Sequence, residues 1–119
     1  MKNYRQKLGA TGERIAAEYL KEKGYLIKDR NFRVREGEID LIAEKNYEYI
    51  FIEVKTRTSP KFGPPEESVN LKKQEKYAAV IEKYLEKNRL KNALWHCEII
   101  SLMIDKKQNT ICLRHFKKI

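Results

Sequence analysis

The sequence predicts an α/β fold in which a central mixed β-sheet is flanked by helices, in the order α-β-β-β-α-β-β. Two segments place apolar residues at helical spacing, and five shorter runs are rich in β-branched and aromatic residues, as strands are. The chain has 119 residues, of which 41% are hydrophobic, a size and composition that suit one core. We therefore expect a single domain over residues 1–119.

The first helix is expected over residues 11–23. Thr11 can cap its start, and Gly24 can end it in a left-handed turn. Apolar and small residues at helical spacing mark the face that packs on the sheet: Leu8, Gly12, Ile15, Ala16, Tyr19 and Leu20. Glu13 lies on the flank of this face, so its carboxylate is expected to point toward the protein body or its rim.

The remaining elements follow from strand-like and helix-like patterns. Strands are expected over residues 25–33, 38–43, 48–57, 94–104 and 110–116. Asn46 marks the turn between the second and third strands. The second helix is expected over residues 69–88, with an inner face made by Tyr77, Ala78, Ile81, Tyr84 and Leu85. Short turns favour antiparallel pairing, whereas the long crossover through this helix could return a strand parallel to its neighbour.

The composition favours a polyanionic partner. The 26 Lys and Arg residues outnumber the 17 Asp and Glu residues and give a net charge of +9, which favours phosphate contacts with nucleic acid. No run approaches the roughly 20 apolar residues that a membrane helix needs, and the N-terminal segment lacks the apolar core of a signal peptide. We expect a cytoplasmic protein, not bound to a membrane, in which Cys97 and Cys112 are thiols.

Alternation along two strands predicts a pair of facing carboxylates. Glu53 and Lys55 share one face of the third strand with Phe51 and Arg57, and Ile50, Ile52 and Val54 point the other way. In the second strand Asp40 is expected to share a face with Glu38 and Ile42, while Ile39 and Leu41 take the opposite face. If the two strands pair across the turn, Asp40 and Glu53 project from the same side of one sheet.

Two carboxylates in this arrangement suit a divalent cation. Like charges repel unless a cation lies between them, and Mg²⁺ takes one or two carboxylates while keeping positions for water and phosphate oxygens. We expect Asp40, Glu53 and the Val54 carbonyl to bind Mg²⁺ or Mn²⁺, with Glu13 reaching the ion through a water. Lys55 would orient the attacking water or balance charge in the transition state. About two Glu-x-Lys pairs arise by chance in such a composition, so the prediction depends on their convergence with Asp40.

Several segments between residues 9 and 85 match one known family: Gly12-Glu13, Arg30-Asn31, GEIDLIA at 37–43, FIEVKTR at 51–57, Phe62-Gly63 and Lys73-Gln74. By these segments the chain resembles the YraN-like family of uncharacterised bacterial proteins. That family looks like a distant relative of the archaeal Holliday junction resolvases in the PD-(D/E)xK superfamily. The resemblance implies a restriction endonuclease-like fold, a DNA substrate and a homodimer.

The resemblance also implies roles for individual residues. Asp40 and Glu53 become metal ligands, Lys55 the catalytic lysine, and Glu13 the carboxylate from the first helix. The superfamily's proline before the aspartate is Ile39 here, which alters little because the proline is not a ligand. Further residues near this site in sequence are candidates for contacts with DNA: Arg57, Lys61, Lys72, Lys73, Gln74 and Lys76.

The expected function is therefore metal-dependent endonucleolytic cleavage of DNA, including structured or branched DNA. Two alternatives use the same fold. One is a nucleic-acid-binding or scaffolding module that does not cleave, and the other is a structural partner in a larger DNA-processing complex. Cleavage is favoured over both because an idle site has no need to hold like charges together.

Two features near the C-terminus have a structural interpretation. Cys112 and His115 form a Cys-x-x-His spacing, with His96 and Cys97 as further candidate zinc ligands. Each pair points to opposite faces of a strand, so four ligands are not expected to converge, and buried thiols with polar histidines at the sheet edge are preferred. Trp95 could stack on a base, but the area that a Trp buries favours the core or a dimer interface.

Overall fold

The protein's computed structural model describes residues 4–58 and 71–117, with side chains from residues 6–58 and 77–117. Within these residues the chain forms two helices and five strands in the predicted order. The helices are α1 (Tyr4–Glu22) and α2 (Leu71–Lys87). The strands are β1 (Leu26–Val34), β2 (Gly37–Lys45), β3 (Glu48–Arg57), β4 (Leu94–Asp105) and β5 (Thr110–Phe116).

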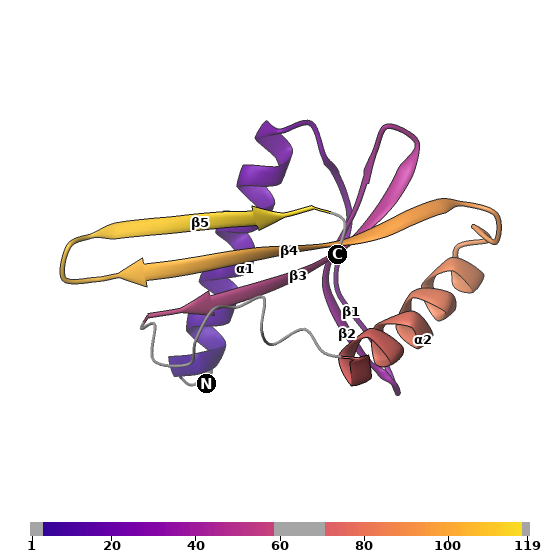
Figure 1. Ribbon diagram of the computed structural model, residues 1–119, viewed down its shortest axis with the longest axis horizontal. Helices are drawn as coiled ribbons and strands as arrows, with labels where there is room; N and C mark the ends of the chain where they lie inside the picture. Colours follow the sequence, from indigo (N-terminus) through magenta and orange to yellow (C-terminus); the bar gives the residue numbers. More distant parts are fainter. Residues whose placement is uncertain (1–3, 59–70, 118–119) are drawn as a thin grey trace.

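The strands form one mixed sheet in the order β1-β2-β3-β4-β5 (Figure 1). β1, β2 and β3 pair antiparallel, β3 and β4 pair parallel, and β4 and β5 pair antiparallel. The single parallel step is the one that α2 spans, as the long crossover predicted. The predicted fold class is confirmed, and the arrangement is consistent with a restriction endonuclease-like fold.

The ends of α1 confirm one prediction and correct another. α1 begins at Tyr4, so Thr11 lies inside the helix and does not cap it. The residues before Thr11 are mostly good helix formers, and a single Gly9 does not outweigh them. The predicted left-handed end is confirmed, because Gly24 has φ 92°. Its N–H donates to the Lys21 carbonyl at 3.1 Å, and the Tyr25 N–H donates to the Leu20 carbonyl at 2.9 Å, which together form a Schellman motif.

The turn between β2 and β3 also follows the prediction. Asn46 has φ 53° and Tyr47 has φ 63°, the two left-handed residues that a tight type I′ hairpin turn requires. Asparagine adopts this conformation more readily than most residues, which is why the turn forms at this point. The turn fixes the register of β2 against β3, with Lys45 opposite Glu48 and Leu41 opposite Ile52.

The two helices cover opposite faces of the sheet. Buried residues of α1 pack on Leu41, Ile52 and Ile100, and those of α2 pack on Ile42 and Phe51. Fully burying each such aliphatic side chain contributes about 1.5–3 kcal/mol to stability. Val80 is buried on the inner face of α2, whereas Ala78 is exposed and was wrongly predicted there, because it lies outside the helical stripe that Tyr77 and Tyr84 define. Neither helix of the described residues is long and apolar enough to span a membrane.

A close approach between α1 and β3 explains a second glycine. A Cβ on Gly12 would overlap the Thr56 side chain, starting at Oγ1. Gly9, one turn earlier, has no atom within 4 Å of the position that a Cβ would take. Gly12 is therefore required by packing of the helix on the strand, and Gly9 is not.

Gly12→Ala is expected to destabilise the protein by about 1–3 kcal/mol, because the extra carbon must push α1 away from Thr56. Gly9→Ala is the matched control, and we expect it to stabilise the protein by up to about 1 kcal/mol through helix propensity. Urea unfolding of both variants measures the difference. Equal effects of the two substitutions would contradict the close approach.

The C-terminal hairpin is tied to the rest of the fold through Glu98, whose side chain is only 3% exposed. Glu98 Oε1 accepts the Tyr25 hydroxyl at 2.9 Å and lies 2.6 Å from His115 Nε2. Glu98 Oε2 lies 2.6 Å from His96 Nε2. These contacts join β4, β5 and the segment that follows α1, so the carboxylate links three parts of the chain.

Both histidines extend this network instead of lying free at the sheet edge. His96 Nδ1 lies 2.7 Å from Glu48 Oε1, and His115 Nδ1 lies 3.0 Å from the Tyr19 hydroxyl. Their side chains are 16% and 6% exposed, which corrects the prediction of polar edge histidines.

Candidate functional site

The candidate site begins where the pairing of β2 with β3 ends. The last paired residues are Leu41 and Ile52, so one further step places Asp40 across from Glu53. Asp40 Oδ2 accepts the backbone N–H of Val54 at 2.8 Å. The Asp40 carboxylate is therefore held against β3 by a main-chain donor, at the end of the hydrogen-bonded ladder.

Glu53 and Lys55 form a close ion pair beside Asp40. Lys55 Nζ lies 2.8 Å from Glu53 Oε1, with the Glu53 side chain 5% exposed and the Lys55 side chain 27% exposed. The predicted alternation of β3 is confirmed, because Ile50 and Ile52 pack on the α1 side and Phe51 packs on the α2 side. A buried carboxylate and a partly exposed ammonium group thus lie together at one point of the sheet.

Asp40 is electrostatically strained in this environment. Burial raises the pKa of Asp40, and the negative charges of Glu13, Glu53 and Glu38 raise it further. The hydrogen bond from Val54 opposes these effects, and the resulting pKa is about 7. The charged form of Asp40 is therefore disfavoured, and a nearby positive charge would favour it.

Asn31 lies across from Asp40 on β1, between the paired residues Arg30↔Leu41 and Phe32↔Ile39. Its φ is 52°, a left-handed conformation inside a strand. Here the β1–β2 hairpin departs from simple alternation, because Ile39 packs with Ile42 on the α2 side. Ile39 was predicted on the face of Leu41, and that prediction is wrong; the change of face in β2 coincides with the left-handed Asn31 on the neighbouring strand.

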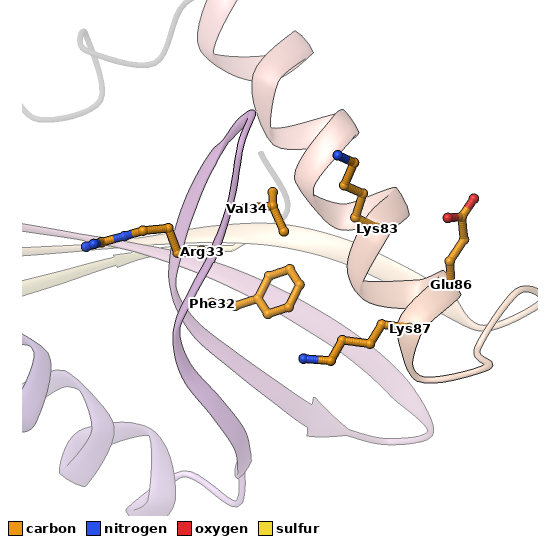
Figure 2. Close-up of a pocket in the computed structure, with 6 residues that line it drawn as sticks. All are labelled: Phe32, Arg33, Val34, Lys83, Glu86 and Lys87. Carbon is orange, nitrogen blue, oxygen red and sulfur yellow. The ribbon is translucent and has the colours of Figure 1, made fainter.

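A pocket lies between β1 and α2. Figure 2 shows Phe32 and Val34 pointing toward α2, with Arg33 pointing away from it. The pocket drawn there has a volume of about 480 Å³ and is lined on the helix side by Lys83, Glu86 and Lys87. Lys83 is paired with Glu36 at 2.7 Å, so this basic wall is partly neutralised.

Glu13 reaches the same region from α1. The Asn31 side-chain amide is oriented with its NH₂ group toward two carboxylates. In this orientation its nitrogen lies 3.1 Å from Glu13 Oε2 and 3.1 Å from Glu38 Oε1. Glu38 also pairs with Arg33 at 3.0 Å. An open pocket of about 440 Å³ lies beside these groups, lined by Gln6, Gly9, Ala10, Glu13, Asn31, Arg33 and Glu38. The predicted orientation of Glu13, toward the protein body at its rim, is confirmed.

Comparison with known proteins assigns the chain to a family. Residues 12–110 match the profile of the uncharacterised protein family UPF0102, a span that includes Glu13, Asp40, Glu53 and Lys55. The chain belongs to this family. The predicted likeness to YraN-like proteins is therefore confirmed.

Individual UPF0102 proteins match over most of their length. A relative from Alkaliphilus oremlandii is 45% identical over 108 residues, which are 89% of this chain and 92% of the relative. One from Clostridioides difficile is 42% identical over 104 residues, covering 87% and 91%. One from Caldanaerobacter subterraneus is 40% identical over 104 residues, covering 87% and 85%. Each of these matches covers more than four fifths of both chains.

Tyr77 is a site residue of this UPF0102 protein that sequence reasoning assigned only to the core. Burial raises the pKa of Tyr77, and the charges of Glu53 and Asp40 and a hydrogen bond to Glu53 raise it further. The Tyr77 hydroxyl on α2 therefore lies near the carboxylates of both Asp40 and Glu53. An aromatic residue at helical spacing predicts burial, but the sequence carries no signal for the carboxylate that its hydroxyl meets.

The remaining predicted DNA contacts of the UPF0102 chain are only partly described. Arg57 is the last residue of β3, two positions beyond Lys55. Lys61 lies outside the described residues. The backbones of Lys72, Lys73, Gln74 and Lys76 belong to the first part of α2, and their side chains lie outside the described residues. These four positions therefore lie in the N-terminal part of α2, just before Tyr77.

The donor set at the site is limited to carboxylates. Among the described residues, no three His, Cys, Asp or Glu side chains lie close enough to hold a metal ion without other ligands. Asp40 and Glu53 would have to be completed by backbone oxygen and water, as Mg²⁺ commonly is. An oxygen-only set of this kind suits Mg²⁺ or Mn²⁺ better than a softer metal.

The two cysteines and Trp95 add no carboxylate to the candidate site. Cys97 and Cys112 are both thiols, as predicted. Burial and the charge of Glu53 raise the pKa of Cys97 to about 11. Cys112 is exposed, contrary to prediction, because β5 is the last strand of the sheet. Trp95 is 43% exposed and packs one edge against Phe51, with ring centroids 5.9 Å apart, so it is only partly a core residue.

Proposed function

We propose that this UPF0102 protein is a metal-dependent endonuclease that hydrolyses phosphodiester bonds in DNA. The observation that carries the proposal is the meeting of Asp40 with the Glu53–Lys55 ion pair at the end of the β2–β3 ladder. Burial of Asp40 is the main reason why its pKa is raised, and the nearby charges of Glu13, Glu53 and Glu38 add to the effect, so the charged form is costly without a cation. Such an arrangement is typical of sites that bind a cation.

The residues fit Mg²⁺ or Mn²⁺. Asp40 and Glu53 would supply the carboxylate ligands, with the Val54 carbonyl as a third oxygen and Glu13 acting through a water. When bound, a divalent cation supplies polarisation of the scissile phosphate and activation of water. Oxygen ligands in this number leave coordination positions for the substrate, as phosphoryl chemistry requires.

The chain's own groups have separate tasks in this proposal. The Val54 N–H fixes the Asp40 carboxylate, and the Tyr77 hydroxyl helps to fix Glu53. Lys55 places a positive charge beside Glu53, suited to neutralising the negative charge that develops on the phosphate in the transition state. Arg57, Lys61, Lys72, Lys73, Gln74 and Lys76 would bind neighbouring phosphates, in keeping with the net charge of +9.

The test is a cleavage assay on linear, flapped and four-way DNA with Mg²⁺ or Mn²⁺. We expect wild-type protein to cut at least one of these substrates. Asp40→Ala and Lys55→Ala should each lower the rate by about 100-fold or more, the usual effect of removing a preorganised charge. Lys107→Ala is the matched control, since this exposed lysine lies in the β4–β5 turn, and its rate should equal that of wild type.

The same experiment separates cleavage from binding alone. Absence of cutting on every substrate, with tight binding kept by Asp40→Ala and Lys55→Ala, would replace the proposal with a binding or scaffolding module. Absence of binding at low salt would favour a structural role in a larger complex. A homodimer would supply one site for each of two strands, and measurement of molar mass in solution with and without DNA tests that part of the proposal.

A further inference from the structure

We propose that Asn31 is a positioning residue of this site, whose side-chain amide holds the Glu13 carboxylate of α1 beside Asp40. The inference rests on the proposed function, because it concerns the same carboxylates. It adds a role for β1, which contributes no acidic or basic group to the proposed chemistry.

The placement of Asn31 is unusual for a strand residue. It lies between the paired residues Arg30↔Leu41 and Phe32↔Ile39, so it is directly across from Asp40. Its φ of 52° is tolerated by Asn and Gly better than by other residues. In this backbone conformation the Asn31 side chain reaches the Glu13 carboxylate of α1.

The contacts of the amide are specific. Its nitrogen lies 3.1 Å and 3.2 Å from the two oxygens of Glu13 and 3.1 Å from Glu38 Oε1. Carboxylates only accept hydrogen bonds, so the NH₂ group and not the carbonyl oxygen must face them. Its two N–H groups are enough to serve one carboxylate on α1 and one on β2. Asn31 therefore joins three elements around the candidate site.

The negative charges near Asn31 explain why its hydrogen bonds are useful. Glu13 and Glu38 both lie near enough to Asp40 to raise its pKa. Mutual repulsion would favour rotation of these side chains into solvent, away from the site. A neutral donor between Glu13 and Glu38 opposes that rotation without adding a positive charge that would compete with a metal ion. Partners that orient metal-site carboxylates in this way commonly affect metal affinity by tenfold or more.

Two substitutions separate the backbone from the amide. Asn31→Gly keeps the left-handed conformation and removes the donor. Asn31→Asp keeps the size of the side chain but replaces the donor with another acceptor. Asn109 provides a matched control, because it has φ 54° in the β4–β5 turn, far from the site in the fold. Asn109→Gly removes a left-handed asparagine without touching the carboxylates.

The experiment measures Mn²⁺ binding by calorimetry at pH 7, together with DNA cleavage. We expect Asn31→Gly to weaken Mn²⁺ binding about tenfold and Asn31→Asp to weaken it at least as much. Asn109→Gly should bind Mn²⁺ as wild type does. Glu13→Gln should weaken binding to a similar extent, and the double variant Asn31→Gly/Glu13→Gln should be no weaker than Glu13→Gln alone, because Asn31 acts through Glu13.

The outcomes distinguish the two proposals. Wild-type cleavage with unchanged Mn²⁺ binding in Asn31→Gly would overturn the role of Asn31 and leave the proposed function intact. Additive losses in the double variant would also overturn it, since they would mean that Asn31 and Glu13 act independently. Failure of wild-type protein to bind Mn²⁺ and to cut DNA would overturn both.

Discussion

Asp40→Asn is expected to stabilise the metal-free protein above pH 7 while abolishing DNA cleavage. The pKa of Asp40 is raised from its ordinary value of 3.8 to about 7. A raised carboxyl pKa means that the folded state binds a proton more tightly than the unfolded state. That contribution to stability is fully present below pH 3.8 and is lost as the pH rises through 7. Above pH 7 the charged Asp40 therefore destabilises the fold.

Asparagine removes the charge and keeps an oxygen that can accept the Val54 N–H. We expect a gain of about 2 kcal/mol at pH 8, less than the full pKa shift would give because Asp40 keeps some contact with solvent. At pH 3, where the carboxyl group of Asp40 is protonated in both states, most of the gain should vanish. Urea unfolding in EDTA at several pH values measures this difference.

Two controls accompany the measurement. Asp29→Asn changes an exposed aspartate on β1 and should show no comparable gain at pH 8. Saturating Mg²⁺ should stabilise wild-type protein and leave Asp40→Asn nearly unchanged, because a ligand stabilises only the state that binds it. A variant less stable than wild type at pH 8 in EDTA would show that Asp40 is not strained.

Glu98→Gln is expected to destabilise the protein by about 3 kcal/mol at pH 7, because charge-assisted hydrogen bonds to both histidines are lost. Burial alone would raise the pKa of Glu98, but hydrogen bonds from His96, His115 and Tyr25 outweigh it and lower the pKa. The lowered pKa means that the carboxylate contributes stability above pH 4.5, its ordinary value, and loses it as the pH falls through the folded value. The deficit of the variant should therefore shrink in acid.

Denaturant unfolding of wild type and Glu98→Gln at pH 7 and pH 3 tests this sign. Tyr25→Phe removes one of the three donors to the same carboxylate and should cost about 1.5 kcal/mol, less than Glu98→Gln. Glu86→Gln, on the exposed side of α2, should be neutral at both pH values. A deficit for Glu98→Gln that stays constant from pH 7 to pH 3 would contradict the role of its charge.

The fold and the pairing that sets Asp40 opposite Glu53 were predictable because they depend on local pattern. Alternation along β3 and the turn at Asn46 were enough to set Asp40 against Glu53, since a short turn fixes the register of a hairpin. The Schellman end at Gly24 followed from one residue type at the end of an apolar stripe. In each of these cases the deciding residues are close together in the sequence.

The residues that sequence reasoning missed owe their roles to distant neighbours. Asn31 reads as an ordinary polar residue in a strand, and only its left-handed backbone and the approach of Glu13 give it a partner. Tyr77 follows the helical stripe, yet its hydroxyl meets Glu53 from another element. The Glu98 network joins His115 and Tyr25, which are distant in sequence, so no spacing could predict it.

The antiparallel part of the sheet affects the order in which the protein folds. Glu13, Asn31, Asp40, Glu53 and Lys55 all belong to α1 and the β1–β2–β3 meander, a contiguous stretch joined by tight turns. Contacts between near neighbours form faster than those that close a long loop, such as the parallel union of β3 with β4. During synthesis these residues leave the ribosome before α2, β4 and β5, which then pack on the sheet that the earlier segments form.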